Sequence, residues 1–326
     1  MDRAPLHNDI AEGPEDAAAF WALAPDGVRV RVAVWGAARA RATVLLFPGR
    51  TEYVEKYGRA AGELAARGFA TMAIDWRGQG LADRLHDDPG LGHVDRFDTY
   101  QRDVTAMCQV AQALGLPRPF HLLAHSMGGC IGLRALHEGL DVASAVFTAP
   151  MWGIRFSPLV RRAAWALSAA SRPLGLDRRV TPTKGGKTYV LACRFDDNEL
   201  TGDPEMFGYM RRQLAQRPEM AVGGPSLAWL HEALRETRLL ARMPPPPVPA
   251  LTYLGIDERI VCPNAIRLIT GAWAAGTLRE IEGARHEVMM EDVPIRTRVF
   301  DEAAAHFIRH AAPRPPMRVL DPIGQG

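Results

Sequence analysis

Short apolar runs alternate with amphipathic segments along most of this chain. After the alternating stretch VRVRVAVWG (28–36), the runs are ATVLLFPG (42–49), ATMAIDWRG (70–78), PFHLLAHS (119–126), VASAVFTAP (142–150), ALTYLG (250–255) and TLREIEG (277–283). Continuous apolar runs of this length predict strands buried on both faces, as in a parallel sheet. Segments with helical apolar spacing lie between them. The pattern therefore predicts an α/β fold, a mostly parallel sheet with helices on both faces.

The alternation stops after residue 150 and resumes at residue 248. Between these points the chain is rich in Arg, Trp and Pro, with helix-like pieces at 157–170 and 226–241 and irregular sequence between them. We therefore expect a sheet domain that is interrupted by a long insertion. The expected parts are a lead-in that is partly helical at best (1–27), a first core part (28–150), the insertion (151–247), a second core part (248–312) and a Pro-rich tail (313–326).

Composition and charge limit the class of protein. Hydrophobic residues make up 47% and charged residues 23% of the 326-residue chain, which is ordinary for a globular enzyme. The net charge of +2 gives no reason to expect a nucleic-acid partner. The four cysteines lack metal-ligand spacing, so we expect free thiols and no metal site. The sequence begins without a signal-peptide pattern and no window approaches about 20 apolar residues, so we expect a cytoplasmic protein.

LLAHSMGGC, residues 122–130, places a serine between a predicted strand and a predicted helix. The nucleophile elbow of serine hydrolases reads G-x-S-x-G, and it needs a strand before the serine and a helix after it. Ala124 stands where the first glycine is usual, and Gly128 supplies the second. The turn requires small residues at both positions, and Ala124 adds one methyl group. We predict that Ser126 is a nucleophile rather than an ordinary serine in an apolar stretch.

A serine hydroxyl needs a base that takes its proton, and the base should follow the serine on a loop after a late strand. His286 lies in EIEGARHEVMMED, directly after the last predicted strand. The other candidates fit less well, because His125 is expected to point along the elbow, and His306 and His310 belong to the C-terminal helix. We therefore predict that His286 is the base.

The remaining parts are an acid and two amide donors for the oxyanion. YLGIDERIV offers two adjacent acids at the end of a predicted strand, Asp257 and Glu258. One oxyanion donor should be the amide of Met127, directly after the nucleophile. The other should come from the loop after an early strand, where LLFPGRTEY places Gly49 and Arg50.

Together these segments resemble the α/β-hydrolase family, and within it the bacterial lysophospholipase and monoacylglycerol lipase-like branch of the serine aminopeptidase S33 type. The resemblance covers roughly residues 28–310. It rests on five matches in order: P-G-x-x-E at Pro48, Gly49 and Glu52, DWRGQG (75–80), HSMGG (125–129), GIDERIV (255–261) and GARHEVMMED (283–292). The resemblance implies that Glu258 is the acid. Because the family has aspartate there, Asp257 stays open as the alternative.

The resemblance also implies that residues 151–247 form a cap over the active site and supply the walls of its pocket. We expect Glu52, Trp152 and Trp229 among the pocket residues. Within the cap, SPLVRRAAWALSAASRPLG (157–175) is amphipathic and basic. One interpretation is a helix that rests on an anionic membrane surface at the inner face, and the other is a helix that packs on the core.

The function that the resemblance implies is cleavage of a carboxylic ester of a single-acyl lipid, a lysophospholipid or a monoacylglycerol, through an acyl-enzyme. Such a reaction needs no metal ion or organic cofactor. A second hypothesis keeps the fold and makes the chain an aminopeptidase or amidase, which would need acids in the cap to meet a substrate ammonium. The basic balance of residues 151–247 stands against it. A third is a catalytically inactive binding protein, which the complete set of serine, histidine and acid disfavours.

Overall fold

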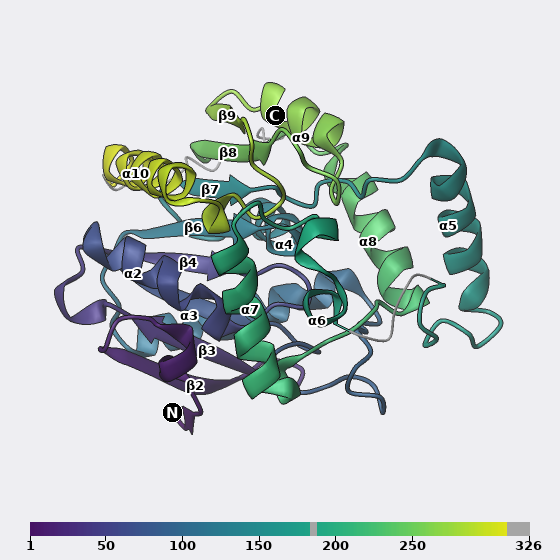
Figure 1. Ribbon diagram of the computed structural model, residues 1–326, viewed down its shortest axis with the longest axis horizontal. Helices are drawn as coiled ribbons and strands as arrows, with labels where there is room; N and C mark the ends of the chain where they lie inside the picture. The colour runs from purple at the N-terminus through teal and green to yellow at the C-terminus, as the bar shows by residue number, and fades with distance from the viewer. Residues whose placement is uncertain (183–187, 312–326) are drawn as a thin grey trace, which may run out of the picture.

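A nine-stranded sheet forms the centre of the part of the chain that the structure, a computed structural model, describes: residues 1–182 and 188–311 (Figure 1). The strand order is β1-β2-β3-β5-β4-β6-β7-β8-β9. The strands are β1 (Arg3–Ala4), β2 (Ala17–Leu23), β3 (Arg29–Trp35), β4 (Ala42–Phe47), β5 (Phe69–Asp75), β6 (Phe120–His125), β7 (Ala145–Thr148), β8 (Ala250–Gly255) and β9 (Gly276–Ile281). Pairing is parallel from β5 to β9 and antiparallel from β1 to β5, so the mostly parallel sheet is confirmed. The predicted tail, residues 313–326, lies outside the described residues.

Helices cover both faces of this sheet (Figure 1). The longer helices are α2 (Gly58–Ala66), α3 (Tyr100–Ala113), α4 (Met127–His137), α5 (Pro158–Ser171), α7 (Pro204–Gln216), α8 (Leu227–Leu240), α9 (Pro263–Gly271) and α10 (Val293–Arg309). The short ones are α1 (Asn8–Ala11), α6 (Tyr189–Ala192) and the 3-10 segments η1 (Ala37–Arg39), η2 (Val54–Tyr57), η3 (Phe97–Thr99), η4 (Phe195–Asp197), η5 (Pro218–Met220) and η6 (Val288–Met290). Side chains alternate along a strand, so Leu45 and Phe47 of β4 face the core under α3 and α4. Val44 and Leu46 face the core under α2 and α10.

The carboxyl ends of the parallel strands meet at one edge of the sheet, and the predicted site residues follow these ends. β6 ends immediately before Ser126, and β8 ends two residues before Asp257. β4 ends at Phe47, shortly before the loop of Arg50, and β9 ends before the loop of His286. Ligands of open α/β sheets bind outside this edge.

The N-terminal segment corrects the expectation of a lead-in that is partly helical at best. Residues 17–23 form β2, which pairs antiparallel with β3 along its whole length. Three consecutive alanines concealed this strand in the sequence, because alanine is depleted in strands. The strand is stabilised instead by its tertiary context, since Phe20 and Ala22 are buried in the core.

The chain between β7 and β8 contains more helix than the sequence indicated. α5 and α8 match the predicted helix-like pieces, but α7 lies where irregular sequence was expected. The missed signal is Asp203 before Pro204, since the Asp203 carboxylate accepts hydrogen bonds from the first amides of α7. α5 lies at the edge of the molecule beside α8 (Figure 1). Among the described residues, no helix combines the length and the hydropathy that crossing a bilayer requires.

Candidate active site

Ser126 lies at the junction between β6 and α4, in a strained backbone conformation. Its φ of 50° and ψ of −117° are rare for a residue other than glycine. Three backbone hydrogen bonds hold it there: its amide donates to the carbonyl of Thr148 (3.1 Å), and its carbonyl accepts from the amides of Gly129 (2.9 Å) and Met151 (2.7 Å). Strain of this kind persists only where the surroundings enforce it, and it clusters at functional sites. The turn at Ser126 therefore has the geometry of a nucleophile elbow.

Ala124, in the place of the usual glycine, is accommodated by a glycine of α4. Ala124 is fully buried. A side-chain carbon built on Gly132 would lie 3.2 Å from the Ala124 methyl carbon and 3.0 Å from the Leu122 side chain. Both distances are shorter than ordinary van der Waals contact. Because Gly132 has no side chain, the Ala124 methyl group fits between β6 and α4.

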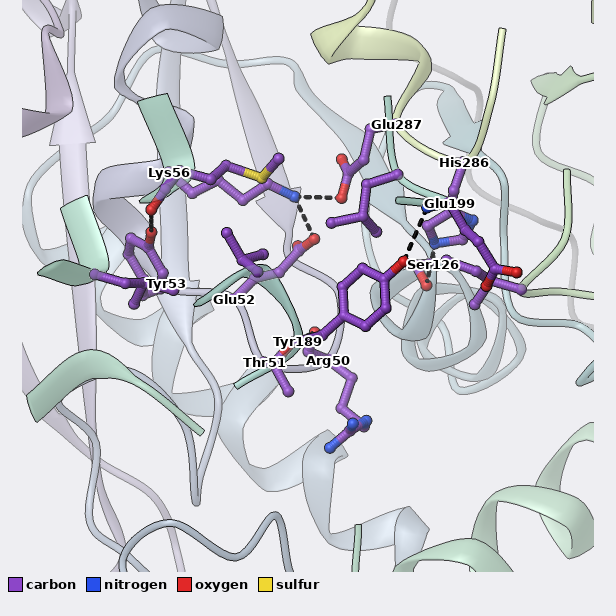
Figure 2. A pocket seen from close by; sticks show the side chains of 15 residues that line it. Arg50, Thr51, Glu52, Tyr53, Lys56, Ser126, Tyr189, Glu199, His286 and Glu287 are labelled. Atoms are coloured by element: carbon purple, nitrogen blue, oxygen red, sulfur yellow. Dashed lines mark hydrogen bonds and ion pairs between the residues drawn. The ribbon is translucent and has the colours of Figure 1, made fainter. Parts of the chain in front are cut away.

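The structure brings Ser126, His286 and Glu258 into one hydrogen-bonded chain. His286 Nε2 lies 2.9 Å from Ser126 Oγ, a contact that Figure 2 shows, and His286 Nδ1 lies 2.7 Å from Glu258 Oε2. Glu258 and His286 are buried, whereas Asp257 is exposed. The geometry therefore favours Glu258 over Asp257 as the partner of His286, although the roles of all three residues stay predictions.

The acid is positioned by the turn that follows β8. Glu258 Oε1 accepts hydrogen bonds from the amides of Ile260 (2.6 Å) and Val261 (3.0 Å), which fix the carboxylate. Gly255, the last residue of β8, lies against the histidine loop (residues 283–292). A side-chain carbon on Gly255 would come within 2.3 Å of two carbonyl oxygens of that loop, so glycine is what lets the two segments approach each other.

Neighbouring charges and burial shift the pKa of His286 in opposite directions. Burial alone would lower the pKa of His286, but the carboxylates of Glu258, Glu287 and Glu52 together raise that pKa, with Glu258 contributing most of the rise. Burial alone would raise the pKa of Glu258, but His286 and the two amides lower it. Glu258 is therefore ionised and able to stabilise an imidazolium, as the acid of a serine–histidine–acid triad does.

The two predicted oxyanion donors lie at the ends of β4 and β6. Met127 is the first residue of α4, so its amide has no acceptor within the helix. In the loop that carries Arg50, the backbone amides directly before and after Arg50 both form hydrogen bonds to side chains. The amide of Gly49 donates to the Glu52 carboxylate, and the amide of Thr51 donates to a glutamine side chain at 2.9 Å. The assignment of the Arg50 and Met127 amides to an oxyanion stays a prediction.

Ser126 and His286 line a cavity of about 300 Å³ (Figure 2). Its apolar lining consists of Val190, Leu200, Met210, Leu214 and Ile260. Its polar lining includes Arg50, Glu52, Tyr189 and Glu199. The cavity thus has walls of both characters next to Ser126 Oγ, and it includes Glu52 of the predicted pocket residues.

Trp152 and Trp229 do not line this cavity, contrary to the prediction. Trp152 is only 1% exposed, its Nε1 donates to the carbonyl of Gly129 (3.1 Å), and its ring packs against Phe147. Trp229 is buried in the same core, where its ring lies near Phe97. Aromatic residues in a sequence predict burial, but they do not tell whether a side chain faces a core or a pocket.

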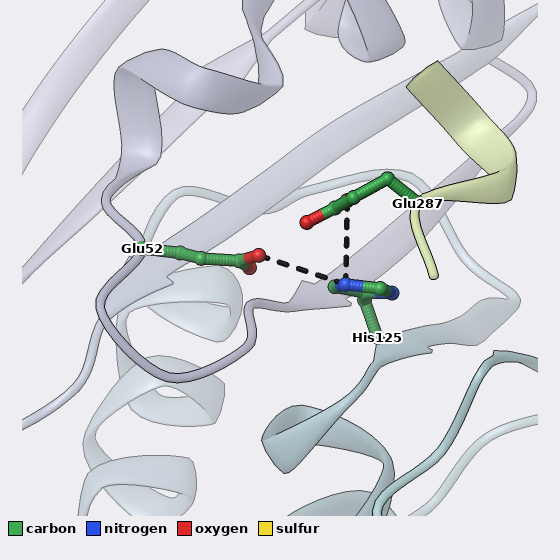
Figure 3. A group of neighbouring side chains, drawn as sticks. All are labelled: Glu52, His125 and Glu287. Carbon is green, nitrogen blue, oxygen red and sulfur yellow. Dashed lines mark ion pairs between the residues drawn. The ribbon is translucent and has the colours of Figure 1, made fainter. Parts of the chain in front are cut away.

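A buried group of charged and ionisable side chains lies beside the triad. Sequence reasoning named Glu52 among the pocket residues and His125 only as a less suitable base. Lys56 Nζ contacts Glu52 and lies 2.5 Å from Glu287 Oε1. His125 Nε2 lies 3.3 Å from Glu287 Oε2 and 3.6 Å from Glu52 Oε1 (Figure 3). By distance, Glu52, His125 and Glu287 could hold a metal ion. The Lys56 ammonium already supplies a positive charge to both carboxylates.

Comparisons with known proteins identify the family to which this chain is similar. The family model described as "Serine aminopeptidase, S33" matches residues 38–293. "Lysophospholipase L2" of Escherichia coli (strain K12) is 33% identical over 299 residues, which cover 88% of this chain and 86% of that protein. "Probable lysophospholipase L2" of Haemophilus influenzae is 28% identical over 270 residues, with 82% and 84% covered.

Among solved structures, a soluble variant of monoglyceride lipase from Saccharomyces cerevisiae, in complex with a substrate analog, is similar to this chain. The TM-score is 0.68 and the identity 19%, and the match covers 89% of this chain and 94% of that one. At this identity the likeness concerns the fold, and it confirms the predicted fold class.

Proposed function

The chain belongs to the serine aminopeptidase S33 family, within the α/β-hydrolase fold, and from this premise we propose that it is a serine hydrolase that cleaves the carboxylic ester of a single-acyl lipid. The observation that carries the proposal is the hydrogen-bonded chain from Ser126 through His286 to Glu258, which opens onto a cavity with both apolar and polar walls. The similarity to lysophospholipase L2 directs the proposal to lysophospholipids, with monoacylglycerols as the other substrate class.

Acylation follows from the distances. Ser126 Oγ attacks the ester carbonyl while His286 Nε2, 2.9 Å away, takes its proton. The amides of Arg50 and Met127 stabilise the oxyanion of the tetrahedral intermediate. His286, now an imidazolium beside the Glu258 carboxylate, gives the proton to the leaving alcohol. The bond between the acyl carbon and this alcohol oxygen breaks, and an acyl-enzyme is left on Ser126.

Deacylation repeats the same steps with water. His286 takes a proton from a water molecule, which attacks the acyl carbon, and the same amides hold the second oxyanion. The proton then returns from His286 to Ser126 Oγ as the ester bond to the enzyme breaks. The products are a fatty acid and free enzyme, and neither half-reaction requires a metal ion or an organic cofactor.

The domain division expected from the sequence, with residues 151–247 as a cap, is part of the proposal. The support is that this segment supplies much of the cavity lining, namely Tyr189, Val190, Glu199, Leu200, Met210 and Leu214. The apolar members suit an acyl chain. On the polar side, burial lowers the pKa of Arg50 to about 10, and within the described ranges no carboxylate forms an ion pair with it. A partly buried guanidinium of this kind suits a phosphate group.

Contact with the inner face of a membrane is also proposed, for a protein that works in the cytoplasm. α5 exposes apolar and basic side chains together: Leu159 is 77% exposed, Val160 is 50% exposed, and Arg161 and Arg162 are exposed as well. A helix with apolar and basic residues at its surface suits the headgroup region of an anionic bilayer. Such contact would place the cap next to its lipid substrate.

One observation favours the aminopeptidase or amidase hypothesis as a second candidate. Glu199 comes from the proposed cap and lines the cavity, so it is a carboxylate that could meet a substrate ammonium. The names of the relatives favour the lipid ester instead. The two candidates separate in one assay that includes an aminoacyl arylamide beside the lipids.

The experiment that tests the proposal measures fatty-acid release from a lysophospholipid and from a monoacylglycerol with the same acyl chain. Wild type and Ser126→Ala are compared at equal concentrations of folded protein. We expect release by the wild type and none above background by Ser126→Ala. Release that persists in Ser126→Ala would contradict the mechanism, and release from neither lipid, with turnover of the arylamide, would move the function to amide substrates.

A further inference from the structure

Three loops meet at the cavity. We call them the oxyanion loop, which follows β4 and carries Arg50, the nucleophile turn, which follows β6 and carries Ser126, and the histidine loop (residues 283–292), which follows β9. Each contributes a charged or ionisable side chain to one buried group, from a position within two residues of its proposed catalytic group. Glu52 lies two residues beyond the oxyanion donor of its loop. His125 immediately precedes Ser126, and Glu287 immediately follows His286. All three side chains are buried, and they point toward one another (Figure 3).

Lys56 joins the two carboxylates of this group. It lies on η2, and its Nζ is 2.5 Å from Glu287 Oε1 and in contact with Glu52 Oε1 (Figure 2). The other oxygen of Glu52 accepts hydrogen bonds from the amide of Gly49 and the hydroxyl of Tyr57. The oxyanion loop and the histidine loop are therefore fastened to the same ammonium group.

His125 connects the nucleophile turn to the same carboxylates. Its Nδ1 lies 3.0 Å from both the carbonyl oxygen and the hydroxyl oxygen of Thr148, which fixes the orientation of the ring. Its Nε2 faces Glu287 Oε2 at 3.3 Å and Glu52 Oε1 at 3.6 Å. The ring also lies beside the imidazole of His286, with 4.9 Å between the ring centroids.

Because this cluster is buried, each of its charges depends on the presence of the others. Burial alone would lower the pKa of Lys56, but Glu287 and Glu52 raise it. Burial alone would raise the pKa of Glu287, but His125 and Lys56 hold it well below its usual range. Removing one partner from such a group leaves an uncompensated buried charge, so the remaining side chains must move or take up a proton.

On the basis of the proposed function, we propose that Lys56 is a positioning residue for the reaction. Through Glu52, Glu287 and His125, it fixes the oxyanion loop, the histidine loop and the nucleophile turn relative to one another. A misplacement of about 1 Å at a reacting centre can lower a rate by about 100-fold. Loss of the cluster should therefore slow each folded molecule, in addition to any effect on the amount of folded protein.

The test compares Lys56→Met, which removes the charge at similar volume, with Lys56→Arg, which keeps it. A fluorophosphonate that labels Ser126 counts the competent sites, and kcat and KM for a short p-nitrophenyl ester are expressed per labelled site. We expect Lys56→Met to lower kcat per site by about 10- to 100-fold, with KM changed by less than about threefold. Lys56→Arg should restore most of the loss.

Glu236→Gln is the matched control. The Glu236 side chain is only 3% exposed and pairs with Arg134 between α4 and α8, at distances of 2.6 and 2.8 Å. Its loss perturbs a buried ion pair that holds none of the three loops. We expect a lower melting temperature with kcat per site within about twofold of the wild type.

Two milder variants keep the test decisive if Lys56→Met does not fold. Tyr57→Phe removes one hydrogen bond to Glu52, and Glu287→Gln removes one charge but keeps the shape. The charged and titratable groups that face His286 are Glu258, Glu287, Glu52 and His125, and both Glu287 and Glu52 raise its pKa. Glu287→Gln should therefore move the acid limb of kcat/KM to lower pH, which a purely structural role would not do.

The outcomes separate cleanly. A lower kcat per site in the cluster variants, together with the shifted acid limb, supports the inference. An active wild type whose cluster variants all keep kcat per site within about twofold, with the acid limb unmoved, overturns the inference alone. A wild type that is neither labelled nor active overturns the proposed function and the inference with it.

Discussion

The floor and the roof of the cavity are built in different ways. The floor consists of the residues that follow strand ends, with Ser126, Glu258 and His286 held by hydrogen bonds of 2.7 to 2.9 Å. The roof consists of the lining residues between β7 and β8, among them Val190, Leu200 and Met210, which make mostly apolar contacts. Side chains on rigid strand ends are held within about 0.5 Å of one position. Apolar packing, in contrast, tolerates substitutions that keep the total volume.

This difference suggests a division of work. Groups that perform the same steps on every ester belong on the floor, where position matters most. Groups that recognise one substrate belong on the roof or at its margin, where sequence can change without loss of the chemistry. Variants of Ser126, Glu258 and His286 should lower turnover of all substrates together. Variants of the polar margin, by which we mean the charged side chains that line the cavity outside the triad, such as Arg50, should change the ratio between substrates.

The largest effect is expected from His286→Ala. Without its base, Ser126 cannot transfer its proton, so kcat should fall by about 10⁴-fold or more for lysophospholipid, monoacylglycerol and short ester alike. Circular dichroism should show an intact fold. His310→Ala, at the C-terminal end of α10, is the control and should keep its activity. Substantial turnover of any one ester by His286→Ala would contradict the claim that His286 is the base for all of these substrates.

Glu258→Gln should have the next largest effect. A neutral amide cannot stabilise the imidazolium, and kcat should fall by about 10³- to 10⁴-fold for every ester. Asp257→Asn is the matched control, because Asp257 is exposed and lies outside the hydrogen-bonded chain, and its kcat should stay within about threefold. Steady-state kinetics on one ester decide the matter, and the reverse ranking would assign the acid to Asp257.

Arg50→Met sharpens the comparison at the polar margin. The variant keeps the backbone amide and removes the guanidinium, so the loss of a charge-assisted hydrogen bond should lower kcat/KM for a lysophospholipid by about 10-fold or more. Monoacylglycerol, which has no phosphate, should change by less than about threefold. Arg194→Met is the control, since Arg194 is exposed and lies outside the cavity lining. Equal losses on both lipids would remove Arg50 from phosphate recognition.

The pH dependence tests the electrostatics of the floor. His286 must be unprotonated to act as a base, and its raised pKa places the acid limb of kcat/KM above the ordinary histidine value of about 6.5. Activity should therefore rise with pH through this limb. In Glu258→Gln the main source of the raised pKa is gone, so the residual activity should show a limb at lower pH. A wild-type limb at or below the ordinary value would contradict the assigned contact.

The sequence predicted which residues lie together on the floor because these residues follow the ends of strands. The order of strands and helices placed Ser126, His286 and the Asp257–Glu258 pair after the ends of separate strands, and parallel strands bring such ends together. The choice between Asp257 and Glu258 needed coordinates, since it depends on which of two adjacent side chains turns inward.

The buried cluster and the roof could not be predicted in the same way. Lys56 and Glu287 are 231 residues apart, and no local pattern reports their contact. Trp152 and Trp229 fitted a pocket by composition but pack in the core, because burial does not specify direction. β2 was missed for a related reason, since its alanines have weak strand preference and it is stabilised by pairing with β3.

The smallest effect is expected at the exposed surface of α5, which contributes no residue to the cavity lining. Leu159→Ser should weaken binding to anionic vesicles and lower turnover of a vesicle-embedded lysophospholipid by a factor of about 2 to 10, since partial insertion of one exposed leucine contributes roughly 0.4 to 1.4 kcal/mol. Turnover of a water-soluble ester should not change. Leu268→Ser on α9 is the matched control, because Leu268 is 75% exposed against 77% for Leu159. Equal effects of both variants in cosedimentation would mean that α5 is not the membrane-facing surface, and the roof would then meet its lipid in solution.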